Sequence, residues 1–295
     1  MANAAFGIEH PLVTVRDIAA VAARYEALGF APRPLGRHPW GTVNRLVMFA
    51  DNFIELIAVE DEAAIEADPV GGHIFGRRVR DSLKLGEGIS LLALHSKDVA
   101  ADEAAAVARG AWSAGRVEFR RAVRLPDGSE DEAVVSLAVL PDDAHPRLGV
   151  FLCQQHKPHL VWNPDWLAHP NGADAISAVT VLAPEPAAVA GRLRQVWGAA
   201  AVAEQPGGWR VETAGGLLHV LDEEAVLARF PGMRLPVGAG RRAPCGVAIS
   251  VHTARFHAAV VPAMRIAGVR VEEGAARRIL VPAAYAGGVI LEIHG

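Results

Sequence analysis

Two polar residues interrupt apolar runs near the start of the chain, and their types could carry chemistry together. His10 lies in the run IEHPLVTV at residues 8–15, and Glu55 lies in the run FIELIAV at residues 53–59. Burying a charged group among apolar side chains is costly unless the group has a partner. A metal ion or a polar substrate could be that shared partner. The chemistry therefore depends on whether the fold brings the two side chains together.

The segments around these residues have the patterns of a strand, a helix and two more strands. Residues 8–15 and 53–59 are short apolar runs typical of strands, and residues 43–50 form another. Residues 17–28 have apolar side chains at helical spacing, and Asp17 can cap the helix at its first turn. His10 and Glu55 each stand on a strand face whose other members are mainly apolar.

This succession of strand, helix and strands returns three more times. The later helices are expected at residues 98–109, 186–197 and 254–267, each between strand-like runs. The text VTV at residues 13–15 recurs at 179–181, in the same order relative to a following AAVA. A repeat of about 80 residues predicts a modular α+β body.

Composition excludes several classes of protein. The chain has 295 residues, 51 % of them hydrophobic, and a net charge of −4, which gives no electrostatic argument for nucleic acid. No apolar run has the length of a membrane span, and we expect no signal peptide. The two cysteines, Cys153 and Cys245, indicate buried thiols in a reducing, cytoplasmic setting. The sequence also lacks a phosphate-binding loop and a nucleophile elbow.

Three stretches resemble the vicinal oxygen chelate superfamily, and more closely its glyoxalase-like domain family. They are HPWGTVNRLVMFADNFIELIAV at 38–59, GEGISLLALHSKD at 86–98 and FLCQQHKPHLVWNPDWLAHPNGA at 151–173. The resemblance implies four βαβββ-type modules paired into curled mixed-sheet cups. We expect a glyoxalase-like domain at residues 1–172, with a connector at its end, and a more divergent half at 173–295.

The resemblance also implies a metal in a cup, with ligands from the first and last strands of each paired module. His10 and Glu55 occupy two such positions, and the ion would be Zn, Fe(II), Mn or Ni. The second module departs from the pattern, because Leu91 stands seven residues before Asp98, where a ligand histidine is expected. His156 is then the best third ligand, although it could instead hydrogen-bond the connector.

The loop that enters the second strand is a candidate for substrate binding. It carries His38, Trp40, Thr42 and Asn44, and an amide suits a carbonyl or carboxylate group. It could equally be a structural turn. Gln154 shares the face of His156 on the last strand and is a further candidate.

Three other polar residues fall on strands of the repeats. His95 lies toward the end of its strand, displaced from the ligand position. His219 and Glu292 match the position of Glu55 in the third and fourth modules. Because their first strands lack a histidine, the second half looks poor in metal ligands, although Glu292 could complete a cup with the first module.

Two functions follow from these expectations. The first is a metal-dependent lyase, isomerase or dioxygenase acting on a small substrate with adjacent oxygens, with Glu55 as the residue that moves a proton. The second is a metal-free small-molecule binding protein on the same scaffold, which the leucine at position 91 favours. In either case the partner is a small molecule, and the protein is a monomer or a homodimer.

Overall fold

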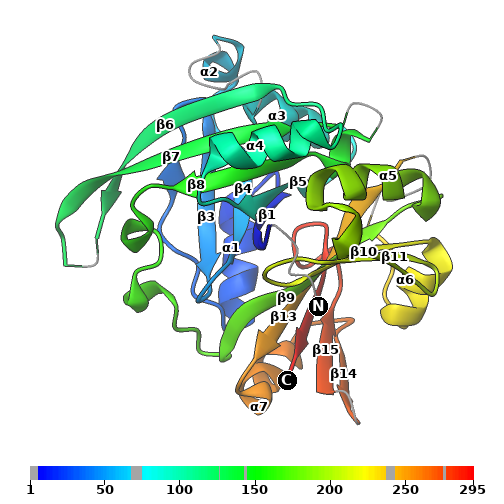
Figure 1. Ribbon diagram of the computed structural model, residues 1–295. Helices are drawn as coiled ribbons and strands as arrows, with labels where there is room; N and C mark the ends of the chain where they lie inside the picture. The colour runs from blue at the N-terminus through cyan, green and yellow to red at the C-terminus, as the bar shows by residue number, and fades with distance from the viewer. Residues whose placement is uncertain (1–5, 68–74, 126, 143–144, 237–242, 275–276) are drawn as a thin grey trace.

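The strands form two curled, mixed eight-stranded sheets, one from each half of the chain (Figure 1). The computed structural model describes residues 6–67, 75–125, 127–142, 145–236, 243–274 and 277–295. Its strands and helices alternate as four βαβββ modules, which confirms the predicted α+β class. Among the described residues, no helix is long and apolar enough to cross a membrane.

The first sheet contains the strands of the first two modules. In spatial order they are β2 (Gly36–Arg37), β3 (Thr42–Met48), β4 (Phe53–Val59), β1 (Ile8–Thr14), β5 (Gly88–His95), β8 (Val150–Gln155), β7 (Glu130–Leu140) and β6 (Gly115–Arg124). The first strand of each module lies at the centre, and the later strands of each module extend outward on its own side.

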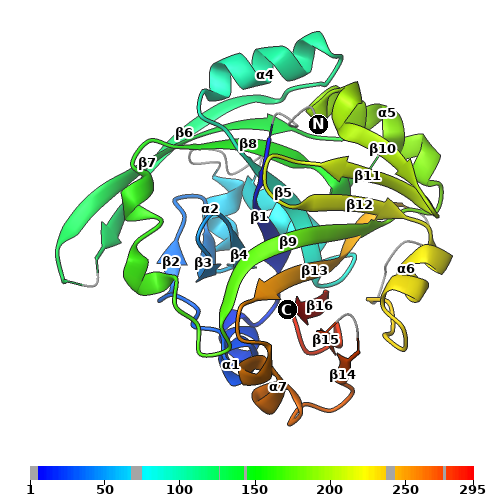
Figure 2. The same ribbon diagram turned by 60° about the horizontal axis from the view of Figure 1, so that its bottom comes forward.

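The second sheet repeats this order with the last two modules. In spatial order it contains β10 (Val202–Gln205), β11 (Gly208–Glu212), β12 (Leu217–Leu221), β9 (Ala173–Leu182), β13 (Cys245–Thr253), β16 (Ile290–His294), β15 (Arg277–Val281) and β14 (Arg270–Glu273). Figure 2 shows β9 and β13 running side by side at its centre. Cys245, on β13, and Cys153, on β8, are buried and form no disulfide.

A helix follows the first strand of each module, and the remaining α-helices of the described residues lie between one module and the next. They are α1 (Ile18–Ala27), α2 (Glu62–Glu66), α3 (Arg77–Ser82), α4 (Val99–Ala108), α5 (Pro186–Trp197), α6 (Glu223–Arg229) and α7 (Phe256–Ala263), with short 3₁₀ turns η2 (Pro146–Leu148), η3 (Pro158–Leu160), η4 (Pro164–Trp166) and η5 (Ala199–Ala201). Asp17 and Asp98 cap α1 and α4, since each carboxylate accepts a backbone N–H from the first turn. The helix expected at residues 17–28 therefore begins at its predicted cap, whereas the helix expected at 254–267 is shorter, Phe256–Ala263.

One apolar core joins the two halves. It includes Val13 of β1, Tyr25 of α1 and Val251 of β13, all fully buried. Asn52 links the halves by two buried hydrogen bonds, because its amide donates to the carbonyl of Ile176 at 3.1 Å and accepts that residue's N–H at 2.8 Å. Burial of one shared core favours a fixed arrangement of the two sheets.

The connector at residues 156–172 packs mainly against the first half. Trp162 and Trp166 lie against a small apolar cluster that contains Leu46 and Phe53. His169 accepts the N–H of Ala31 at 3.0 Å and donates to the carbonyl of Met48 at 2.7 Å. The connector is thus ordered, and its tryptophans cover the first sheet.

Strands β1 and β5 meet antiparallel about a local two-fold axis. His10 pairs with Ala93, and Leu12 pairs with Leu91. The axis therefore exchanges His10 with Leu91 and Leu12 with Ala93. This relation identifies equivalent positions in the two modules.

Candidate functional site

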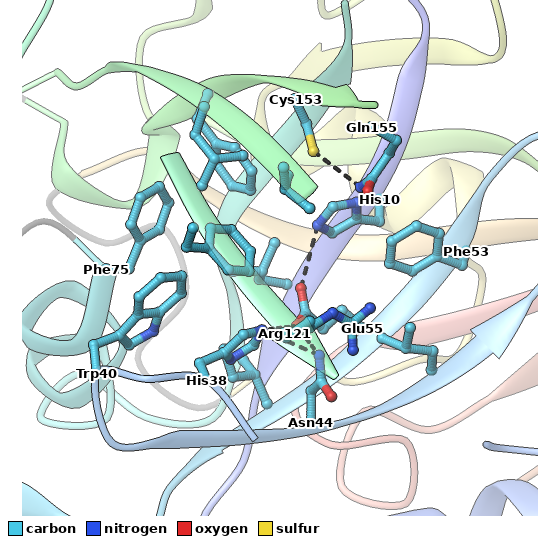
Figure 3. A pocket seen from close by; sticks show the side chains of 17 residues that line it. His10, His38, Trp40, Asn44, Phe53, Glu55, Phe75, Arg121, Cys153 and Gln155 are labelled. Atoms are coloured by element: carbon cyan, nitrogen blue, oxygen red, sulfur yellow. Dashed lines mark hydrogen bonds and ion pairs between the residues drawn. The ribbon is translucent and has the colours of Figure 1, made fainter. Parts of the chain in front are cut away.

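The first sheet curls around a small cavity, which we call the cup (Figure 3). Its volume is about 60 Å³, less than the roughly 150 Å³ of an apolar cavity that holds benzene. The lining residues are mostly aromatic or aliphatic, with a polar group at one end: His10, Leu12, His38, Trp40, Asn44, Leu46, Phe53, Glu55, Ile57, Phe75, Phe119, Arg121, Val135, Leu137, Phe151, Cys153 and Gln155. The cup can therefore enclose only a small group without rearrangement.

His10 and Glu55 meet directly at the polar end of the cup. Nε2 of His10 lies 3.2 Å from Oε2 of Glu55, and each side chain is only 6 % exposed. The imidazole also stacks on Phe53, with ring centroids 4.1 Å apart. The fold thus brings His10 and Glu55 together, because β1 and β4 are adjacent strands.

A second carboxylate lies on the opposite side of the imidazole. Oε1 of Glu9 is 3.5 Å from Nδ1 of His10, and Glu9 is completely buried. Its carboxylate also contacts Nδ1 of His95 at 3.2 Å and accepts a hydrogen bond from Gln155 at 3.0 Å. Because the strand pairing shifts between Ile8 and His10, both neighbouring side chains can reach this cluster.

Asn44 and His38 complete the polar end. The Asn44 amide donates to Oε1 of Glu55 at 2.7 Å and lies 3.3 Å from Nε2 of His38. Nδ1 of His38 lies 2.9 Å from the hydroxyl of Thr42. Three of the four predicted loop residues therefore contact Glu55 or one another, and Trp40 stacks on His38 with ring centroids 4.9 Å apart.

The two histidines beside Glu55 have opposite protonation preferences. Burial alone would lower the pKa of His10, but the carboxylates of Glu55 and Glu9 raise it to about 9. Burial lowers the pKa of His38 to about 4, with Arg121 and His10 adding to the effect against the attraction of Glu55. At neutral pH, His10 is therefore an imidazolium ion and His38 is neutral.

The carboxylate of Glu55 stays ionised. Burial alone would raise its pKa, but hydrogen bonding and attraction from His10, with help from His38 and Asn44, lower it to about 2. A carboxylate with so low a pKa is a weak proton acceptor, because general bases work best with a pKa near the operating pH.

Aromatic rings form the wall opposite this polar end. Trp40 stacks near Phe75, with ring centroids 5.3 Å apart, and meets the edge of Phe119 at 4.9 Å. Its indole Nε1–H is buried and has no acceptor among the described residues. A buried donor without a partner favours binding of a ligand that carries an acceptor.

The two-fold axis shows which donors a metal ion would find. Glu55 pairs with Leu12 on β1, and Phe151 pairs with Ala93 on β5. Phe151 is therefore the counterpart of Glu55, as Leu91 is of His10. Both are buried in the apolar cluster beside the cup, and the Phe151 ring lies 5.7 Å from the ring of His10.

These residues do not fit a metal ion. Two of the four symmetry-related positions hold hydrocarbon side chains, which have no donor atom. Glu9 and Glu55 face different nitrogens of His10, so one ion cannot contact all three side chains. Within the described parts of the chain, no three His, Cys, Asp or Glu side chains form a group that could hold a metal.

Two predicted site residues lie away from the cup. His156 is exposed beyond the end of β8, and its Nε2 lies 2.8 Å from the hydroxyl of Ser136. Gln154 accepts the N–H of Val99 and donates to the carbonyl of Lys97, at the start of α4. They share one face of β8, as expected, but the cup is lined by the alternate residues, which end at Gln155.

His219 and Glu292 of the second half contact residues of the second sheet. Nδ1 of His219 lies 3.2 Å from Oε1 of Gln205, and burial, with Arg229 and Arg210, lowers the pKa of His219 to about 4. Glu292 accepts a hydrogen bond from Ser250 at 2.5 Å within the second sheet. Glu292 therefore does not complete the cup of the first module.

Sequence reasoning missed three contributors to the polar cluster. Glu9 was hidden by its place beside His10 on one strand, and only the shift in pairing brings both to the site. Gln155 could have been found by choosing the other face of β8. Arg121 lies between Phe119 and Val123 on one face of β6. An arginine on a strand of mixed polar and apolar residues gives no distinctive signal.

Comparison with known proteins identifies the family. The glyoxalase-like domain model matches residues 8–197. The chain belongs to the glyoxalase-like domain family. The match covers the whole first sheet and reaches into the third module. No curated protein sequence matches the chain.

Solved structures share the fold of this glyoxalase-like protein at low identity. A hypothetical protein from Staphylococcus aureus has a TM-score of 0.68 at 12 % identity, over 98 % of each chain. A triple mutant of 4-hydroxymandelate synthase from Streptomyces coelicolor has a TM-score of 0.54 at 12 % identity, over 98 % of this chain and 92 % of that one. A xylose isomerase-like TIM barrel/4-hydroxyphenylpyruvate dioxygenase fusion protein has a TM-score of 0.52 at 16 % identity, over 99 % of this chain and 49 % of that one. These matches support the fold of both halves.

Proposed function

We propose that this glyoxalase-like protein binds a small organic molecule in the cup without a metal ion. The observation that carries the proposal is the presence of Leu91 and Phe151 at the counterparts of His10 and Glu55. A glyoxalase-like cup with donors at all four positions would hold an ion, whereas here only two of the four positions carry donors, and these two pair with each other.

The protonation states also favour binding over proton transfer. Glu55 is held as a carboxylate between His10 and Asn44, and its low pKa makes it a weak base. A metal-dependent lyase, isomerase or dioxygenase reaction, as in the dioxygenase part of the fusion protein's name, therefore has less support here.

The lining describes the kind of ligand. The aromatic wall of Trp40, Phe75, Phe119 and Phe151 suits a short apolar body. The unpartnered N–H of Trp40 and the Asn44 amide offer hydrogen bonds to polar atoms. The ligand class is thus a small, mainly apolar molecule with a polar group at one end.

A cavity-filling variant tests this proposal. Val135 lines the cup, so Val135→Phe fills it while leaving every polar group in place. Isothermal titration with propionamide, a small aliphatic amide, is expected to show saturable binding to the wild type that Val135→Phe weakens at least tenfold. Val134→Phe, on the other face of the same strand, is the matched control and should bind normally. Equal binding by both variants would contradict the proposal, as would the absence of binding to the wild type.

A further inference from the structure

The cup adjoins a larger cavity, which we call the vestibule. Its volume is about 320 Å³, and it shares Asn44, Leu46 and Arg121 with the cup. Its described lining residues come from β2, β3, β6, the segment before β2 and the connector: Arg33, Pro34, Leu35, Gly36, Asn44, Leu46, Arg121, Ala122, Val123, Arg124, Leu125 and Trp166. Three of these are arginines and none is acidic, so the vestibule carries positive charge.

Arg121 stands where the two cavities meet. Figure 3 shows its side chain beside Glu55, next to Asn44 and His38. Within the described residues, its guanidinium forms no hydrogen bond or ion pair, although it is partly buried. The carboxylate of Glu55 is already occupied by His10 and Asn44. The guanidinium donors of Arg121 are therefore available to a ligand.

Gly36 shows how closely the polar groups converge. A Cβ atom added at Gly36 would lie 2.4 Å from Oδ1 of Asn44 and 3.5 Å from Nη1 of Arg121. The absence of a side chain at Gly36 therefore gives the Asn44 amide its room. The Asn44 acceptor and the Arg121 cation both border this point between the cup and the vestibule.

Arg33 adds a second cation on the vestibule side. Its guanidinium lies over the ring of Trp166, 3.3 Å from the centroid, and its Nη1 is buried without a partner among the described residues. Burial lowers the pKa of Arg33 to about 9, and repulsion from Arg121 contributes. Two arginines that repel each other across a cavity without acidic residues are stabilised by an anion between them.

We propose that the vestibule binds an oxyanion of the ligand, a carboxylate or a phosphate, on Arg121 and Arg33, while the apolar body of the ligand enters the cup. Guanidinium groups bind both oxyanions through paired N–H donors. Because the cup is smaller than a cavity that holds benzene, the body that it accepts is a short alkyl group. The ligand class is therefore a small organic anion. This inference rests on the proposed binding function of the cup.

Three probes with the same ethyl group test the inference. Isothermal titration would compare propionate, ethyl phosphate and the neutral propionamide. At low salt, at least one anion is expected to bind about tenfold more tightly than the amide, with an affinity that falls as salt is added. The comparison of the two anions shows whether a carboxylate or a phosphate suits the vestibule.

Variants of the arginines locate the effect. Arg121→Gln should remove the preference for the anions over propionamide, and Arg121→Lys should keep part of it. Arg33→Gln should reduce the preference by a smaller factor. Arg120→Gln is the matched control, because Arg120 is the neighbour of Arg121 on β6 and its side chain lies on the other face. There it forms an ion pair with Glu132 at 3.0 Å. Circular dichroism and melting curves would establish that each variant is folded.

The outcomes separate this inference from the proposed function. Equal binding of propionamide and both anions would overturn the anion site and leave the binding function standing. An anion preference that survives Arg121→Gln and Arg33→Gln would also overturn the anion site. Absence of binding for all three probes would contradict both proposals.

Discussion

Phe151 occupies in the second module the position that Glu55 occupies in the first. The equivalence follows from pairing alone, because Glu55 lies opposite Leu12 and Phe151 lies opposite Ala93 across a local two-fold axis. The same axis makes Leu91 the counterpart of His10. At these four positions the first module therefore contributes charged groups and the second contributes hydrocarbon.

Restoring the missing donors is expected to create a metal site. The double variant Leu91→His with Phe151→Glu places an imidazole and a carboxylate at the counterparts of His10 and Glu55. It should bind about one equivalent of Zn, which the wild type should not, and its melting temperature should rise when Zn is added. Adding His10→Ala should abolish this binding. Failure of the folded double variant to bind Zn would mean that the two-fold relation does not extend to the side chains.

The two histidines of the cup should titrate far apart. In NMR spectra of the ring protons, His10 is expected to lose its proton only when the pH rises to about 9. His38 is expected to gain a proton only when the pH falls to about 4. Glu55→Gln removes one of the carboxylates that hold the proton on His10, so the pKa of His10 should fall by at least one unit. An unchanged pKa of His10 in this variant would show that the contact with Glu55 does not control its charge.

Stability should decrease at alkaline pH because of His10. The folded-state pKa of His10 is raised from 6.5 to about 9, so its contribution is fully present below pH 6.5 and is lost as the pH rises through 9. One pKa unit corresponds to about 1.4 kcal/mol, and we expect a loss of roughly 1–3 kcal/mol in the free energy of unfolding between pH 6 and pH 9.5. Urea denaturation measures this loss. The variant His10→Gln should show a clearly smaller loss over the same range, and an equal loss in both proteins would contradict the assignment.

Gly36 should be intolerant of a side chain for reasons of space. Its added Cβ would displace Asn44, whose amide is held by Glu55 and His38, so Gly36→Ala should weaken ligand binding at least fivefold. Gly191 in α5 has open space around an added Cβ, and Gly191→Ala should bind normally and gain about 0.5–1 kcal/mol of stability, since alanine favours helices. Normal binding by Gly36→Ala would show that Asn44 is not needed in its present position.

Asn52 should be important for holding the two halves together. Asn52→Ala removes both buried hydrogen bonds to Ile176. The N–H and C=O groups of Ile176 then lose these partners. The expected loss is about 2–4 kcal/mol in the free energy of unfolding, from the cost of unsatisfied buried groups. Replacement of exposed Asp51, its neighbour in the turn, by Ala should cost much less. Equal effects of the two substitutions would argue against this role.

The sequence predicted the modular fold because local signals agreed with each other. Helix caps such as Asp17 and Asp98 lie where the chain turns from strand to helix, and both caps are formed. Edge strands gave weaker signals. β2 contains only Gly36 and Arg37, and its pairing with β3 depends on neighbours rather than on its own residues.

The site was predicted in part for a similar reason. His10 and Glu55 stand out because a charged residue in an apolar strand is rare, and their contact follows from adjacent strands. The choice between Gln154 and Gln155 depends on which face of β8 lines the cup, and a shift of one residue exchanges the faces. Arg121 and Glu9 reach the site only through sheet curvature and a pairing shift, which a single sequence does not encode in a recognisable pattern.

Metal content measured directly tests the central claim, that this cup binds its ligand without an ion. The untagged protein would be incubated in turn with Zn, Mn, Fe(II) and Ni, freed of unbound metal and analysed by elemental mass spectrometry, beside the variant His10→Ala. The account predicts well under one equivalent of every metal in the wild type, with no difference from the variant. About one equivalent of any of these metals in the wild type, lost in His10→Ala, would contradict it.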